Sequence, residues 1–193
     1  MKKLILCLVL LFVVAGASLF SFEANDLTKF PPFTENKEWI FNLGAGIGNL
    51  DWLARGRIWI PPVRMSFDRN TGIGEKGLPF FFGGVLGYQA WGWKAGYYWY
   101  NNERWMVHRV SAGFRAGYHF NWGVEKLDTY AVTTVGTRVS FNKDGLYWNN
   151  YLDWVYVGVN LGVRFYPAKN FGFWAEVGYT TVSFLDLGIS FKF

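Results

Sequence analysis

Histidine and serine are the side chains of this chain that could carry out hydrolysis, so their spacing comes first. The two histidines, His108 and His119, lie in one segment with Ser111. If that segment is a strand, His108 and Ser111 point to opposite faces, because successive side chains alternate. His119 shares a face with Ser111 but lies roughly 26 Å away, at about 3.3 Å per residue. We therefore expect no catalytic pair, and no enzyme.

The sequence gives equally little support for binding of a metal, a nucleotide or a nucleic acid. The only cysteine is Cys7, close to the amino terminus, and two histidines do not supply a typical zinc site. The glycines of "GAGIG" (44–48) lack the strand-to-helix context of a phosphate loop. The net charge of +5 includes no run of Lys and Arg for phosphates. We expect no metal, no cofactor and no nucleic-acid partner.

A stronger signal is a set of charged residues on the less apolar face of alternating segments. These residues are Arg64, Arg109, Arg115, Arg138, Arg164, Glu176 and Asp186, together with His119 and Lys192. A charge in a low-dielectric interior must pair or reach water. We predict an ion-pair network anchored by Glu176 and Asp186, with Arg164 and Arg138 as the nearest basic partners.

Eight segments with a period of two must position these charges. They cover residues 38–48, 60–68, 79–91, 105–120, 129–141, 154–166, 170–180 and 184–193, with turn residues between them. Pro61-Pro62 must begin a strand or lie at its edge, because proline cannot donate to the ladder. Residues 92–104 could be a separate strand, but we favour an extension of two neighbouring strands because the count then stays even.

Composition separates a soluble β-protein from a membrane barrel. Aromatic residues make up 21% of the chain and charged residues only 17%, and there are 23 glycines. A soluble sandwich would need charge on its outward face, whereas here the second face is mainly Gly, Ser, Thr and Asn. Glycine suits the crowded interior of a narrow barrel with bulky residues facing lipid. We predict an all-β fold, an eight-stranded antiparallel transmembrane β-barrel.

The amino terminus is typical of an export signal. Lys2 and Lys3 precede an apolar core at 4–14 and an A-x-A site at 15–17. We expect cleavage after about Ala17; an uncleaved anchor helix is the alternative. The predicted organisation is a signal peptide at 1–17, an irregular segment at 18–37 and the barrel at 38–193.

Several segments resemble the small outer-membrane β-barrel superfamily, the broad OmpA/OmpX/OmpW-like group, and an uncharacterised eight-stranded branch of it. They are "IPPVRMSFD" (60–68), "FFFGGVLGY" (80–88), "GFRAGYHFN" (113–121), "KLDTYAV" (126–132), "NFGFWAEVGY" (170–179) and "LDLGISFKF" (185–193). The resemblance implies an outer-membrane location in a Gram-negative-type envelope. It also implies that Leu187, Ile189, Phe191 and Phe193 form the signal that the barrel-assembly machinery reads. Lipid-facing bulk is their simpler interpretation.

Function is less constrained than fold. The segments 49–59, 92–104 and 142–153 are rich in Trp, Tyr, Asn and Arg, which suits surface contact with a ligand, although interfacial anchoring explains the rings equally well. We expect a structural or surface-interaction role, with a lumen plugged by the charged network. The alternative is a porin-like narrow channel or a transporter of small, hydrophobic solutes, with anion preference from the basic excess.

Overall fold

The computed structural model describes residues 29–31, 34, 37–47, 57–72, 78–94, 104–142, 145–146, 154–179 and 183–193. Its strands are β1 (Trp39–Ile47), β2 (Arg57–Asn70), β3 (Phe80–Lys94), β4 (Arg104–Phe120), β5 (Leu127–Asn142), β6 (Gly145–Leu146), β7 (Tyr156–Phe165), β8 (Phe171–Tyr179) and β9 (Leu185–Lys192). The predicted signal peptide at 1–17 and its cleavage site lie outside the described residues, as does most of the segment 18–37.

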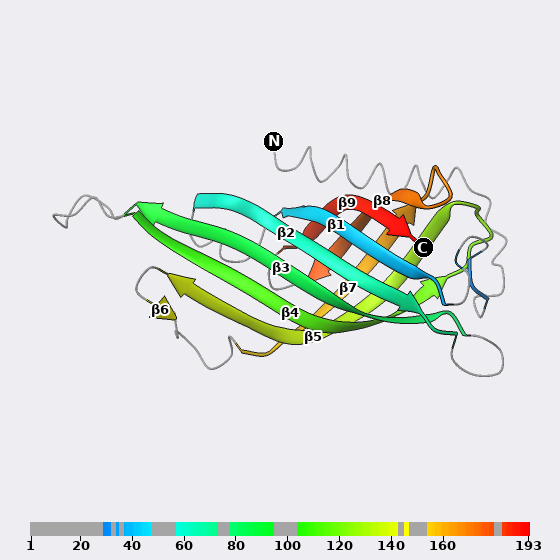
Figure 1. Cartoon of the computed structure of the whole chain (residues 1–193), viewed down its shortest axis with the longest axis horizontal. Coiled ribbons are helices and arrows are strands. Elements are labelled where there is room, and N and C mark those ends of the chain that lie inside the picture. The colour runs from blue at the N-terminus through cyan, green and yellow to red at the C-terminus, as the bar shows by residue number, and fades with distance from the viewer. Residues whose placement is uncertain are drawn as a thin grey trace, which may run out of the picture.

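The eight long strands form one closed antiparallel barrel (Figure 1). Each long strand pairs with the next one along the chain, the two-residue β6 only extends the β5 edge, and β1 pairs with β9 to close the ring. The backbones of Trp39 and Phe193 exchange hydrogen bonds of 2.8 and 3.0 Å, so β1 begins where β9 ends. We call this end the terminal end and the other the opposite end. The predicted eight-stranded barrel is confirmed.

The period of two in the sequence becomes two faces of the wall. Along β7, each residue from Tyr156 to Phe165 alternates between buried and exposed, and the exposed positions are Val, Leu and Phe. The buried positions across the barrel are largely polar, including Asn42, Arg64 and Glu176. A wall that is apolar outside and polar inside is the transmembrane β-barrel pattern.

The described residues contain no helix that is long and apolar enough to cross a membrane.

Two strands begin earlier than predicted, β2 and β5. β2 begins at Arg57, so Pro61-Pro62 lies inside the strand and not at its start. The β2–β3 register shifts between Ile60 and Val63, and β1 pairs with β2 only as far as Val63, so the ladder avoids both prolines. β5 begins at Leu127, which brings Asp128 into the strand.

Strands β2 to β5 extend beyond the rest of the described barrel at the opposite end (Figure 1). They have 14 to 17 residues, whereas β1, β7, β8 and β9 have 8 to 10. Lys94 of β3 pairs with Arg104 of β4, so both ends of the segment 92–104 extend these strands, as favoured from the sequence. Residues 95–103 lie outside the described part.

Candidate functional site: a charged network that fills the lumen

Glu176 of β8 is the centre of a buried network inside the barrel. Arg115 Nη2 donates to its Oε1 at 2.6 Å, and Arg64 Nη2 forms an ion pair with its Oε2 at 2.8 Å. Tyr130 Oη donates to Oε1 at 2.6 Å and Asn160 Nδ2 to Oε2 at 3.1 Å. The four donors come from four different strands, so one carboxylate ties together most of the barrel wall. They also compensate for the loss of water around its charge.

Two further acids continue the network on either side of this centre. Asp186 Oδ2 accepts a hydrogen bond from Arg64 Nη1 at 2.6 Å. On the other side, Asp68 Oδ1 forms an ion pair with Arg115 Nε at 3.0 Å, and its Oδ2 accepts from Arg164 Nη2 at 2.7 Å. Arg64 and Arg115 are therefore each bound between two carboxylates.

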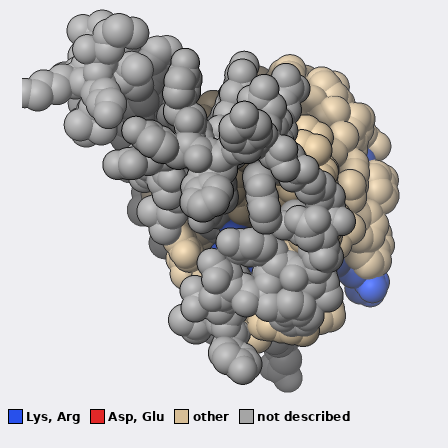
Figure 2. Space-filling view, turned by 90° about the vertical axis from the view of Figure 1, so that its left-hand side faces the viewer, with Lys and Arg blue, Asp and Glu red and all other residues tan. Residues whose placement is uncertain are grey.

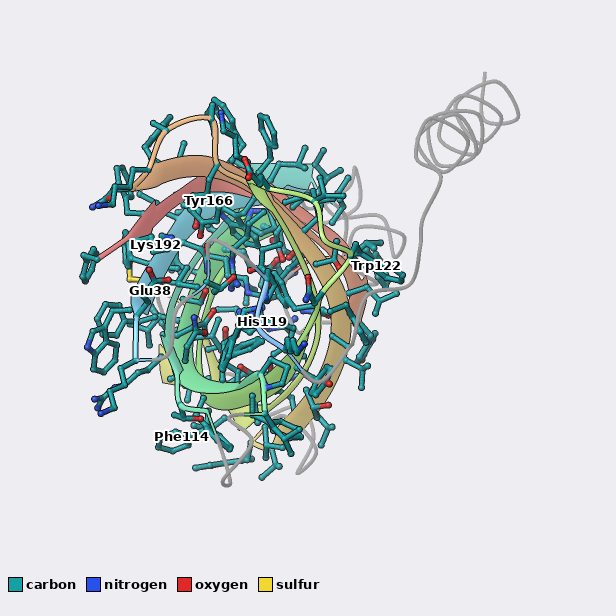
Figure 3. The ribbon with its side chains drawn as sticks, turned by 90° about the vertical axis from the view of Figure 1, so that its right-hand side faces the viewer. Glu38, Phe114, His119, Trp122, Tyr166 and Lys192 are labelled. Atoms are coloured by element: carbon teal, nitrogen blue, oxygen red, sulfur yellow. The ribbon has the colours of Figure 1, made fainter. Side chains whose placement is uncertain are left out.

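Asp128 and His119 end the network near the terminal end of the barrel. Arg164 Nη1 donates to Asp128 Oδ2 at 2.8 Å, and His119 Nδ1 lies 2.7 Å from Asp128 Oδ1. His119 Nε2 lies 2.8 Å from Asn70 Oδ1, and the imidazole packs against the Phe81 ring. Figure 3 shows His119 inside the ring of strands. The complete order of contacts is Asp186–Arg64–Glu176–Arg115–Asp68–Arg164–Asp128–His119.

Toward the opposite end, the inward face is basic and hydroxyl-bearing. Arg109 is buried, its Nε donates to Ser140 Oγ at 3.1 Å, and its guanidinium lies 4.5 Å from the Trp91 ring centre. Arg138 is half-buried and lies across from Ser111 in the β4–β5 register. Within 85–94, 104–114 and 135–142, the described parts of β3 to β5 toward this end, there is no Asp or Glu.

The structure places the seven Arg, Asp and Glu residues singled out in the sequence on the inward face, and five of them lie in the contact chain. Arg64, Arg115, Arg164, Glu176 and Asp186 lie in it, whereas Arg109 and Arg138 lie toward the opposite end.

The predicted partners of Glu176 and Asp186 were wrong. Arg64 and Arg115 bind these acids, while Arg164 binds Asp68 and Asp128.

Sequence reasoning also missed two interior acids. Asp68 lies four residues after Arg64 on the same face of β2. Continuing the alternation of inward residues along the strand would therefore have found it. The sequence predicts a turn at Asp128, and no local signal indicates that β5 already includes this residue. Both are fully buried.

The terminal rim holds a smaller polar cluster. Lys192 Nζ lies 3.2 Å from Glu38 Oε1 and 5.7 Å from the centre of the Tyr166 ring. Tyr166 Oη and Ser190 Oγ are 2.9 Å apart, and burial raises the pKa of Tyr166 to about 12. Lys192, Glu38 and Tyr166 lie on one side of the barrel mouth in Figure 3.

The outer wall is apolar, with aromatic residues gathered at the terminal end. Trp39 stacks on Phe67 at 4.6 Å between ring centres, and Phe171 lies 5.4 Å from Phe191. On the side seen in Figure 2, the described surface is mostly uncharged. Of the four residues expected to form the assembly signal, Leu187, Phe191 and Phe193 are exposed and Ile189 is half-buried.

Aromatic residues also occur toward the opposite end. Trp154 is exposed, and Trp93 pairs with Trp105 in the β3–β4 register. The Trp and Tyr residues at 99–100, 147–148 and 151 lie outside the described residues.

No protein-family model and no curated protein matches the sequence. Among solved structures, the chain is similar to Ail, the attachment invasion locus protein of Yersinia pestis, in complex with the heparin analogue sucrose octasulfate. That match has 12% identity and a TM-score of 0.46, and covers 82% of this chain and 100% of Ail. A second Ail structure gives 12% identity, the same coverage and a TM-score of 0.39. A de novo designed transmembrane β-barrel gives 12% identity, a TM-score of 0.38, and coverage of 86% of this chain and 99% of the design.

The architecture itself is clear from the strand pairing. Eight antiparallel strands close on themselves, the outward side chains are apolar, and the lumen is filled by charged and polar groups. The chain thus has the fold of the small outer-membrane β-barrels that its sequence resembles.

Proposed function

We propose that this protein is a closed outer-membrane barrel with a structural or surface-interaction role. The observation that carries the proposal is the unbroken alternation of arginine and carboxylate across the lumen, from Asp186 to Asp128. The interior of an eight-stranded barrel is only wide enough for side chains to fill it. Ions would have to displace fully buried Arg64, Arg115 and Arg164 from their carboxylates.

With the lumen closed, the surface segments are the part of the protein proposed to contact a ligand. The segments 49–59, 92–104 and 142–153 are joined to strands whose relative positions the network fixes, and their aromatic and polar residues suit contact with a surface ligand. The role proposed is non-enzymatic: His119 is buried between Asp128 and Asn70, and His108 lies on the outward face, bonded to Tyr88 at 2.8 Å.

A second candidate is a narrow channel or a small-solute transporter with anion preference. It is favoured by Arg109 and Arg138, which place positive charge on the inward face toward the opposite end. Recordings of the purified protein in planar lipid bilayers separate the two. We expect no stable conductance above that of protein-free bilayers, whereas large, reproducible, anion-selective steps would favour the channel.

The proposal also includes export, cleavage after about Ala17 and insertion by the barrel-assembly machinery through the last strand. The outward positions of Leu187, Phe191 and Phe193 support both lipid contact and recognition before insertion. Cell fractionation should recover the protein with the outer membrane, and boiled and unboiled samples should migrate differently on a gel. Recovery in the soluble periplasm with identical mobilities would contradict the location.

A further inference from the structure

Phe114 stands out on the lipid-facing wall. It is 85% exposed, more than any other large apolar side chain among the described residues. Its neighbours explain why: Ala112 and Ala116 flank it on the outward face of β4, and Gly84 lies directly across on β3. Figure 3 shows Phe114 projecting away from the barrel. The phenyl ring is therefore a knob surrounded on three sides by residues with little or no side chain.

The space around this knob is an apolar groove of about 780 Å³. Its floor is open at Gly84, where an added Cβ would meet nothing closer than 3.8 Å. The strand beyond β5 has no such hollow in its sequence pattern. The outward residues of β7 are Val157, Val159, Leu161, Val163 and Phe165.

Two hydroxyl groups flank the groove in lipid-facing positions. Thr133 lies across from Ala116 and Thr137 across from Ala112 on the neighbouring β5, and both are exposed. Neither hydroxyl has a hydrogen-bond partner among the described residues, and the bilayer core offers none. Polar side chains and small residues are what transmembrane segments use to associate, because apolar burial supplies no net driving force in lipid.

We propose that this patch is a two-fold interface between two copies of this chain in the membrane. The Phe114 patch consists of Gly84, Ala112, Phe114, Ala116, Thr133 and Thr137. Phe114 of each copy fills the groove above Gly84 of the other, and the threonine hydroxyls gain partners across the interface.

Symmetry and chemistry favour a second copy over a lipid chain. Two copies inserted in the same direction are related by an axis along the membrane normal, so a knob must meet its groove at the same depth. Phe114 and Gly84 are cross-strand neighbours, which places them within about 3 Å of one depth for tilted strands about 4.8 Å apart. An acyl chain could fill the groove but could not hydrogen-bond Thr133 or Thr137.

Single cysteines test the interface directly, because the only native cysteine, Cys7, lies in the predicted signal peptide. Ala112→Cys, Ala116→Cys and the control Val177→Cys, on the exposed face of β8, would be treated in membranes with an oxidant or a short bis-maleimide. We expect a cross-linked dimer from at least one of the two patch variants, persisting as the lipid-to-protein ratio rises tenfold. Patch cysteines that cross-link no more than Val177→Cys would overturn the proposal.

Gly84→Leu is the second test of the interface, because the space at this position lets the barrel accept the larger side chain. In the background of the cross-linking variant, it should reduce the dimer at least tenfold while heat-modifiable gel mobility is retained. An undiminished dimer would show that the groove is not the contact. Native mass spectrometry of the wild-type protein should give a dimer; a monomer carrying bound lipid would assign the groove to acyl chains and overturn the proposal.

Discussion

The two halves of the lumen use the same inward-facing positions in different ways. In the half nearer the terminal end, Arg115 and Arg164 each lie between carboxylates. Toward the opposite end, the described interior carries Arg109 and Arg138 beside serine hydroxyls. Arginine side chains therefore fill the lumen with ion pairs only where carboxylates from other strands reach them. The first half is cross-linked by ion pairs, and the second keeps a basic inward face.

The largest expected effect of breaking the paired half comes from Glu176→Gln. The amide cannot balance Arg64 and Arg115, which would remain buried with too little negative charge. Removing one partner of a buried ion pair costs about 3–5 kcal/mol of folding free energy. Urea unfolding of the barrel in lipid vesicles measures this loss. A loss below about 1 kcal/mol would mean that the charges are hydrated and the half is not closed.

A smaller loss is expected from Gly162→Ala on β7, in the same half. A Cβ at this position would overlap the ring of Tyr130, which is held by its hydrogen bond to Glu176. Overpacking of this kind costs about 1–3 kcal/mol. Gly84→Ala is the matched control, because its Cβ would meet no atom closer than 3.8 Å. Equal unfolding free energies for the two variants would show that Tyr130 is not fixed against β7.

The smallest effect is expected in the basic half. Arg109→Ala removes a hydrogen bond to Ser140 and a ring contact with Trp91, together worth about 1–2 kcal/mol. The same urea titration measures it beside Glu176→Gln. If Arg109→Ala cost as much as Glu176→Gln, the two halves would not differ in the way described.

Most of the fold could be predicted from alternation alone, because lipid outside and a narrow lumen inside leave each position only one suitable face. Alternation also gives the face of each charge, but not its partner. Arg64 of β2 meets Glu176 of β8 across the lumen, and that meeting depends on the stagger of the closed sheet. Asp128 was not predicted as an interior acid, because composition does not locate the start of a strand to a single residue. Asp68 could have been found, since it continues the face of Arg64.

Conductance of the wild-type barrel beside the Arg64→Ala/Glu176→Ala variant tests the central claim most directly. The two substitutions remove opposite charges and two side chains that fill the lumen. Heat-modifiable mobility would establish that the variant still forms a barrel. We predict a silent wild-type protein and a variant with reproducible conductance steps in planar bilayers. Conductance in the wild-type protein, or silence in a folded variant, would contradict a lumen closed by this network.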